Sequence, residues 1–201
     1  MLREKQGIRE LTTELSKIIY QEESGRTTKI MVNRAISWLA QSHIIGYASK
    51  STDCDHLQIK ENCKYYFMDL GIASYFLKIT GEEPRQVKGL LAENYVYLCL
   101  YERMRKKREI AGNAPWFVLY QKTKGELDFF VRSLLDYKNY GIEVKSTDAA
   151  AKTAKRLLED GKLDYLYLLK GDTKGEIPED GKIYAVPLYL ADRIKFNMGG
   201  S

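Results

Sequence analysis

The stretch GELDFFV at residues 125–131 is followed by GIEVKS at residues 141–146, and these two stretches decide the fold. Each reads as a β-strand, in which residues two positions apart point to the same side. Glu126 and Asp128 therefore share one face of the first strand, and the second strand shows the same alternation of charged and apolar residues. The opposite face of the first strand is expected to be buried and carries Leu127, Phe129 and Val131.

An aspartate followed by Glu-x-Lys on the next strand is the combination that a divalent-metal phosphodiesterase needs. The carboxylates of Asp128 and Glu143 offer oxygen ligands to a hard cation such as Mg²⁺, which also binds phosphate. Lys145 beside the metal can orient a water or stabilise charge on the phosphoryl group. The alternative interpretation is a surface hairpin with Glu and Lys in solvent, because strands often alternate charged and apolar residues.

The composition is that of an ordinary globular protein. The chain has 201 residues, of which 44% are hydrophobic and 29% charged, so one or two domains are expected. No apolar run approaches the length of a membrane span, and the N-terminus has no apolar signal core, so we expect a cytoplasmic protein without a membrane partner. The net charge of +5 is compatible with nucleic acid but does not require it. We interpret residues 199–201 (GGS) as a cloning scar.

The N-terminal third has the outline of a winged helix. Residues 9–23 and about 27–41 have helical periodicity, and residues 44–48 and 57–60 read as short strands. We therefore expect a winged-helix-like module at residues 1–64, whose second helix would lie in the DNA major groove. The alternative is a module used for protein packing. The candidate DNA-contacting residues are Lys29, Asn33 and Arg34.

Two cysteines and a histidine lie close together within this module. Cys54, His56 and Cys63 fall within ten residues, but Cys-x-His is poor spacing for a tetrahedral zinc site and no fourth ligand is obvious. The three cysteines of the chain are an odd number, and without an export signal they are expected to be free thiols.

The rest of the chain alternates helices and strands and predicts an α/β sheet with helices packed on it. Glu93 lies within a long predicted helix between apolar and amide residues, which indicates that it is partly enclosed. Strands are expected at 65–68, 116–121, 126–132, 140–146, 165–169 and 183–186, and helices at 72–78, 85–108, 149–159 and 188–194.

Several segments together resemble one protein family. Residues 64–72 (KYYFMDLGI), 89–97 (GLLAENYVY), 126–129 (ELDF) and 142–146 (IEVKS) match, in order, motifs in the C-terminal region of bacterial and archaeal AAA-type ATPases. The resemblance covers about residues 60–170, and a winged helix often precedes this region in the family.

The resemblance implies a PD-(D/E)XK restriction-endonuclease-like fold at residues 65–198, with a mixed sheet and flanking helices. Asp128, Glu143 and Lys145 would stand at the D…E-x-K positions, and Glu93 would be the acidic residue of the first core helix. Glu126 could support the site. It further implies Mg²⁺ or Mn²⁺ as cofactor, DNA as substrate, an ATPase domain as partner in the same chain or in trans, and a homodimer as one way to cut both strands.

Two features depart from the family pattern. No G-x-x-x-x-G-K-[ST] phosphate loop occurs in the chain, so we expect a fragment of a longer protein or a standalone remnant. Residues 119–121 (LYQ) replace the tryptophan that commonly precedes the acidic strand. A catalytically inactive DNA-binding module and a regulatory or interaction domain of an ATPase therefore remain alternatives to a nuclease.

Overall fold

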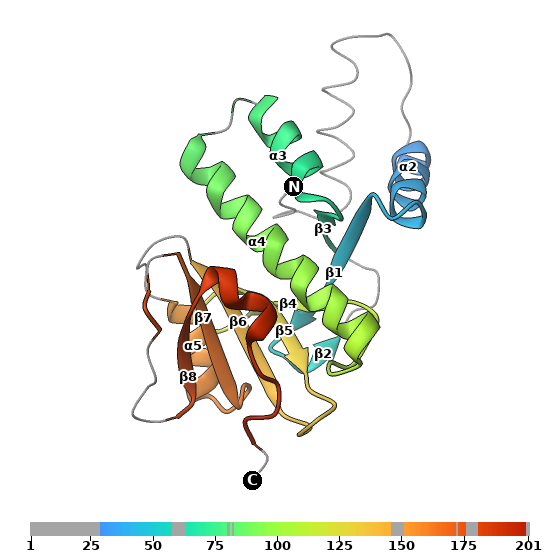
Figure 1. The fold of residues 1–201 in the computed structure, drawn as a ribbon. Helices are drawn as coiled ribbons and strands as arrows, with labels where there is room; N and C mark the ends of the chain where they lie inside the picture. Colours follow the sequence, from blue (N-terminus) through green and yellow to red (C-terminus); the bar gives the residue numbers. More distant parts are fainter. Residues whose placement is uncertain are drawn as a thin grey trace.

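The computed structural model describes residues 29–57, 63–79, 81, 83–145, 151–171, 173–175 and 181–199 (Figure 1). The elements follow one another as α2 (Lys29–Gln41), β1 (Ile45–Thr52), β2 (His56–Leu57), β3 (Lys64–Phe67), α3 (Leu70–Ile79), α4 (Pro84–Glu102), the π-helix η1 (Arg103–Lys107), β4 (Trp116–Tyr120), β5 (Gly125–Arg132), β6 (Asn139–Lys145), α5 (Lys152–Glu159), β7 (Tyr165–Lys170), β8 (Ile183–Pro187) and the 3₁₀ helix η2 (Leu188–Arg193). The helix predicted at residues 9–23 lies outside the described residues.

The strands form one mixed sheet. They lie in the order β2-β1-β4-β5-β6-β7-β8, and β3 pairs with β1 off this path. β4, β5 and β6 are an antiparallel run, whereas β6, β7 and β8 are parallel. α5 lies in the crossover from β6 to β7, because parallel neighbours need a long connection. The predicted α/β fold with flanking helices is confirmed, and every element predicted between residues 65 and 194 is present with shifted ends.

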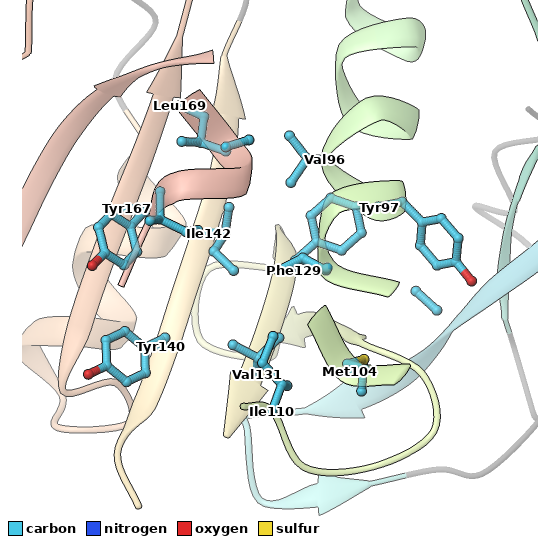
Figure 2. Packing of buried hydrophobic residues seen from close by; sticks show 14 of the residues in the cluster. Val96, Tyr97, Met104, Ile110, Phe129, Val131, Tyr140, Ile142, Tyr167 and Leu169 are labelled. Carbon is cyan, nitrogen blue, oxygen red and sulfur yellow. The ribbon is translucent and has the colours of Figure 1, made fainter. Parts of the chain in front are cut away.

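Helices cover the two faces of the sheet and define two hydrophobic cores. In the first core, Val96 and Tyr97 of α4 pack with residues of β5, β6 and β7, among them Phe129 and Ile142 (Figure 2). In the second core, Leu157 of α5 packs against the other face of the same strands. The central strands are thus buried on both sides, as their apolar sequences favour.

A β-bulge in β5 divides its apolar residues between the two cores. Trp116 pairs with Phe130 but Val118 pairs with Leu127, so two steps on β4 match three steps on β5. The extra residue reverses the alternation, and Phe129 lies in the first core whereas Leu127 lies in the second. The prediction that Leu127 and Phe129 share a buried face with Val131 was therefore wrong for Leu127.

β1 connects the N-terminal elements to the sheet. Its first half pairs antiparallel with β3, its second half pairs parallel with β4, and its end pairs with β2. The predicted strand at residues 44–48 is the first half of β1 and pairs with β3, while β1 continues to Thr52 and forms an antiparallel hairpin with β2 at His56–Leu57. Residues 58–60 of the second predicted strand lie outside the described part. The boundary at residue 64 and the winged-helix assignment stay predictions.

α4 positions the candidate site. It has Pro84 in its first turn, where the missing N–H costs nothing, and continues as η1 until Arg108 adopts a left-handed conformation with φ of 52°. Its most buried side chains include Val96 and Leu100, and Met104 of η1 is buried in the same core, against which Tyr95 and Leu98 also pack. Leu91, Tyr95 and Leu98 are half-buried.

The C-terminal continuation of this helix, η1, is rich in basic residues, and one of them has a structural role. Arg103 of η1 is buried, donates to Glu109 Oε2 from Nε over 2.7 Å, and lies 4.4 Å from the centre of the Phe196 ring. Arg105 and Lys106 remain exposed. Among the described helices, none combines the length and apolar character needed to cross a bilayer.

Candidate functional site

Four carboxylates and one lysine from four elements form a group that we call the acidic cluster. Its members are Lys64 on β3, Glu93 on α4, Glu126 and Asp128 on β5, and Glu143 on β6. Lys64, Glu93 and Glu143 are each 3% exposed. The Glu126 side chain is 39% exposed, so the cluster reaches solvent at this residue.

Lys64 is the cation of the cluster. Its Nζ lies 3.4 Å from Glu93 Oε1, forms an ion pair with Glu126 Oε1, and lies 4.9 Å from the centre of the Phe117 ring. Burial by itself lowers the pKa of Lys64, but the carboxylates of Glu93, Glu126 and Asp128 outweigh burial, and the pKa is raised. Lys64 is therefore charged at neutral pH although it is buried.

Tyr66, two residues after Lys64 on β3, also binds the Glu93 carboxylate. Residues two apart on a strand share a side, and both Lys64 and Tyr66 are on the buried side of β3. The Tyr66 hydroxyl donates to Glu93 Oε1 over 2.9 Å. Burial and the nearby Glu93 raise the pKa of Tyr66 well above its ordinary value, so the hydroxyl stays a donor.

Aromatic packing fixes the ring of Tyr66. It stacks on Tyr97 of α4 with the ring centres 4.4 Å apart and an angle of 7° between the planes, and it lies 5.6 Å from Phe129. Gly46 of β1, the partner of Tyr66 in the β1–β3 ladder, makes room for this stack. A Cβ at Gly46 would overlap Tyr97 Oη and lie 2.9 Å from Met68 Sδ, so the Tyr97 ring would have to shift.

Asn94 joins α4 to the edge of β3. Its Oδ1 accepts from the Phe67 N–H over 2.9 Å, and its Nδ2 donates to the Phe67 carbonyl over 2.8 Å. The side-chain amide thus pairs with β3 as a neighbouring strand would. This contact sets the position of Glu93, the preceding residue, against Lys64 and Tyr66.

Asp128 lies where β5 and β6 stop pairing. The ladder between these strands begins at Phe129 and Ile142, and beyond it the Val144 N–H donates to Asp128 Oδ2 over 2.7 Å. Burial raises the pKa of Asp128 well above its ordinary value, and the charges of Glu143 and Glu93 raise it further. The β5 bulge immediately before Phe130 is the local feature that aims this carboxylate between the strands.

Lys145 is placed only through its backbone. It ends β6 and pairs with Lys170 of β7 in the parallel ladder. Its side chain lies outside what the structure describes, so its predicted role stays a prediction.

The residues fit a hard divalent cation in their chemistry. Asp128, Glu143 and Glu93 offer carboxylate oxygens, which Mg²⁺ and Mn²⁺ prefer, and mutual repulsion in the cluster would be relieved by a cation. Among the described residues, however, no three His, Cys, Asp or Glu side chains are gathered closely enough to hold a metal ion. The side chains would have to close around a cation, and the Lys64 ammonium already supplies one positive charge.

The cysteines are free thiols, as predicted. Cys54 and Cys63 are buried and Cys99 is half-buried. Burial raises the pKa of Cys54 to about 12, and Asp55 adds to the shift, so its thiol is protonated at neutral pH.

The candidate DNA-contacting residues lie on α2, whereas the members of the acidic cluster lie on β3, α4, β5 and β6 (Figure 1). Asn33 and Arg34 are exposed on this helix, and Lys29 begins it. Their predicted contact with DNA stays a prediction.

Sequence reasoning assigned no role to Lys64, Tyr66 or Asn94. The signal was present, because KYYF and EN are the cores of two motifs that carry the family resemblance. In the structure these two motifs bind each other. The Lys64 and Tyr66 side chains contact Glu93. The Phe67 backbone pairs with the Asn94 side chain.

Comparison of the chain with protein-family models, curated proteins and solved structures gave no match. The resemblance to the ATPase C-terminal region therefore stays a prediction.

Proposed function

We propose that this chain is the C-terminal portion of a AAA-type ATPase family protein and acts as a PD-(D/E)XK-like, metal-dependent DNA phosphodiesterase. The observation that carries the proposal is the placement of Asp128. Its carboxylate is held by the Val144 N–H at the separation of β5 and β6, with Glu143 and Glu93 close enough to raise its pKa. Perturbed carboxylates gathered at one point of a fold are typical of functional sites.

The proposed roles follow from the chemistry of each group. Asp128 and Glu143, with Glu93, would hold Mg²⁺ or Mn²⁺, which when bound polarises a phosphodiester and lowers the pKa of a water ligand. Glu126, at the solvent-exposed side of the cluster, supports it through Lys64. Lys145 would orient the attacking water or stabilise charge on the phosphoryl group.

A second candidate is a DNA-binding or regulatory module of an ATPase that does not cleave. The ion pairs of Lys64 with Glu93 and Glu126 favour it, because carboxylates that already have an internal cation need no metal for stability. Salt-dependent duplex binding without cleavage would be its signature.

The test is incubation with supercoiled and branched DNA in Mg²⁺ or Mn²⁺. The wild type is compared with Asp128→Ala and Lys145→Ala, and Asp192→Ala is the matched control, since Asp192 is half-exposed on η2, outside the cluster. Cleavage by the wild type and the control alone supports the nuclease. Equal cleavage by Asp128→Ala would contradict the assignment, and DNA binding without cleavage by any of them would favour the second candidate.

A further inference from the structure

Lys64 is a buried lysine that connects three elements. It extends from β3, and its ammonium contacts Glu93 on α4 and Glu126 on β5. Its side chain is 4% exposed. An ammonium is removed from water at a cost of several kcal/mol, and only paired carboxylates offset that cost. The position of Lys64 therefore depends on the acidic cluster, and the cluster depends on Lys64.

The two carboxylates that pair with Lys64, those of Glu93 and Glu126, differ in their other contacts. Glu93 also accepts from the Tyr66 hydroxyl, so its carboxylate has a second anchor on the same strand face. Glu126 is more exposed and lies at the side of the cluster that reaches solvent. An incoming cation would thus meet Glu126 first and find Glu93 already oriented by Tyr66.

We propose that Lys64 is the built-in counter-ion of the acidic cluster, and that it sets by competition how tightly the cluster binds a divalent cation. This inference rests on the proposed function, because it assumes that Glu93 is one of the metal-binding carboxylates. Lys64 is a positioning residue in this account. Its ammonium holds Glu93 and Glu126 until a divalent cation replaces it.

The first test measures Mn²⁺ binding by calorimetry, without DNA. The variant is Lys64→Met, whose unbranched side chain is one atom shorter than that of lysine and carries no charge. Lys106→Met is the matched control, since Lys106 is an exposed lysine that also pairs with a glutamate. We expect Lys64→Met to bind Mn²⁺ at least about tenfold more tightly than the wild type and the control to bind it unchanged, because a unit charge close to a carboxylate is worth that much at a protein's effective dielectric.

The outcomes separate this inference from the proposed function. Equal affinity of the wild type and Lys64→Met overturns the counter-ion role and leaves the metal site standing. Absence of Mn²⁺ binding by both proteins overturns the counter-ion role together with the metal-dependent function.

A second measurement uses the wild-type protein, so that it stands if Lys64→Met does not fold. Lysine labelling by an amine-acetylating reagent is followed by mass spectrometry with and without Mn²⁺. We expect Lys64 to be poorly labelled in the free protein and labelled several-fold faster at saturating Mn²⁺, while the rate at Lys106 is constant. A Lys64 rate that does not change at saturating Mn²⁺ would contradict the displacement.

Discussion

The Tyr66 hydroxyl lies 2.9 Å from Glu93 Oε1 and joins β3 to α4 at the acidic cluster. The two residues are 27 positions apart in the chain. Tyr66 also stacks on Tyr97, so one side chain contributes both a polar and an aromatic contact between the same two elements. The position of the Glu93 carboxylate is therefore part of the core packing.

Replacing Tyr66 with Phe tests the polar part of this contact. Tyr66→Phe keeps the stack on Tyr97 but leaves the buried Glu93 without this donor, so we expect a loss of about 1–3 kcal/mol in the free energy of unfolding. Urea denaturation measures it. Tyr137→Phe is the control, because Tyr137 is 79% exposed and its change should stay within about 0.5 kcal/mol. Equal stability of the two variants would show that the hydrogen bond contributes nothing net.

Asn94 offers a graded test of the junction between α4 and β3. Asn94→Ala removes both hydrogen bonds to Phe67, and we expect a loss of about 2–4 kcal/mol in the free energy of unfolding. Asn94→Asp keeps an acceptor for the Phe67 N–H, and at low pH its protonated carboxyl can also donate to the Phe67 carbonyl, so it should be intermediate there. Thermal denaturation ranks the three proteins. The reverse order of the two variants would contradict the amide pairing.

The elements of the fold could be predicted because their signals are local. Period-two alternation marks β5 and β6, and helical periodicity marks α4, so each appeared near its expected residues. The β5 bulge could not be predicted, because it depends on how β5 pairs with β4. A pattern read along one strand assigns Leu127 and Phe129 to one face, whereas the pairing assigns them to two.

The acidic cluster was predictable in its carboxylates but not in its cation. Asp128 and Glu143 were found from their spacing, and Glu93 from its apolar neighbours. Lys64 precedes the strand predicted at residues 65–68 and was assigned no role, since lysines are rarely buried unless paired. Its partners lie 29 and 62 residues away in the chain, and no local pattern reveals such pairs.

The raised pKa of Asp128 predicts how stability depends on pH. In the unfolded chain an aspartate ionises near pH 4, whereas in the folded protein burial and the charges of Glu143 and Glu93 keep Asp128 protonated to higher pH. Between these two pKa values the folded state binds a proton that the unfolded state does not, so stability falls as pH rises through the folded pKa.

Asp128→Asn should remove this part of the pH dependence. Without divalent metal, we expect the variant to gain stability relative to the wild type between pH 5 and pH 8, because the amide cannot ionise and still accepts from the Val144 N–H. Urea midpoints at both pH values measure the difference. Parallel pH profiles of the two proteins would show that Asp128 is ionised in the fold at no cost.

Two glycines test the packing around Tyr66 with the same substitution. Gly46→Ala places a Cβ in overlap with Tyr97 Oη and 2.9 Å from Met68 Sδ, so Tyr97 must move and its stack on Tyr66 must be disturbed. We expect a loss of about 1–3 kcal/mol in the free energy of unfolding, as for other overpacked cores.

Gly89→Ala lies within α4, and no atom lies within 4 Å of its added Cβ. That variant should gain about 0.5–1 kcal/mol, because alanine favours the helix over glycine. Chemical denaturation of both variants gives opposite signs if the close approach of Tyr97 to β1 is as described. A stable Gly46→Ala protein with an unchanged near-ultraviolet circular dichroism spectrum, which reports on the tyrosine stack, would instead place Tyr97 away from β1.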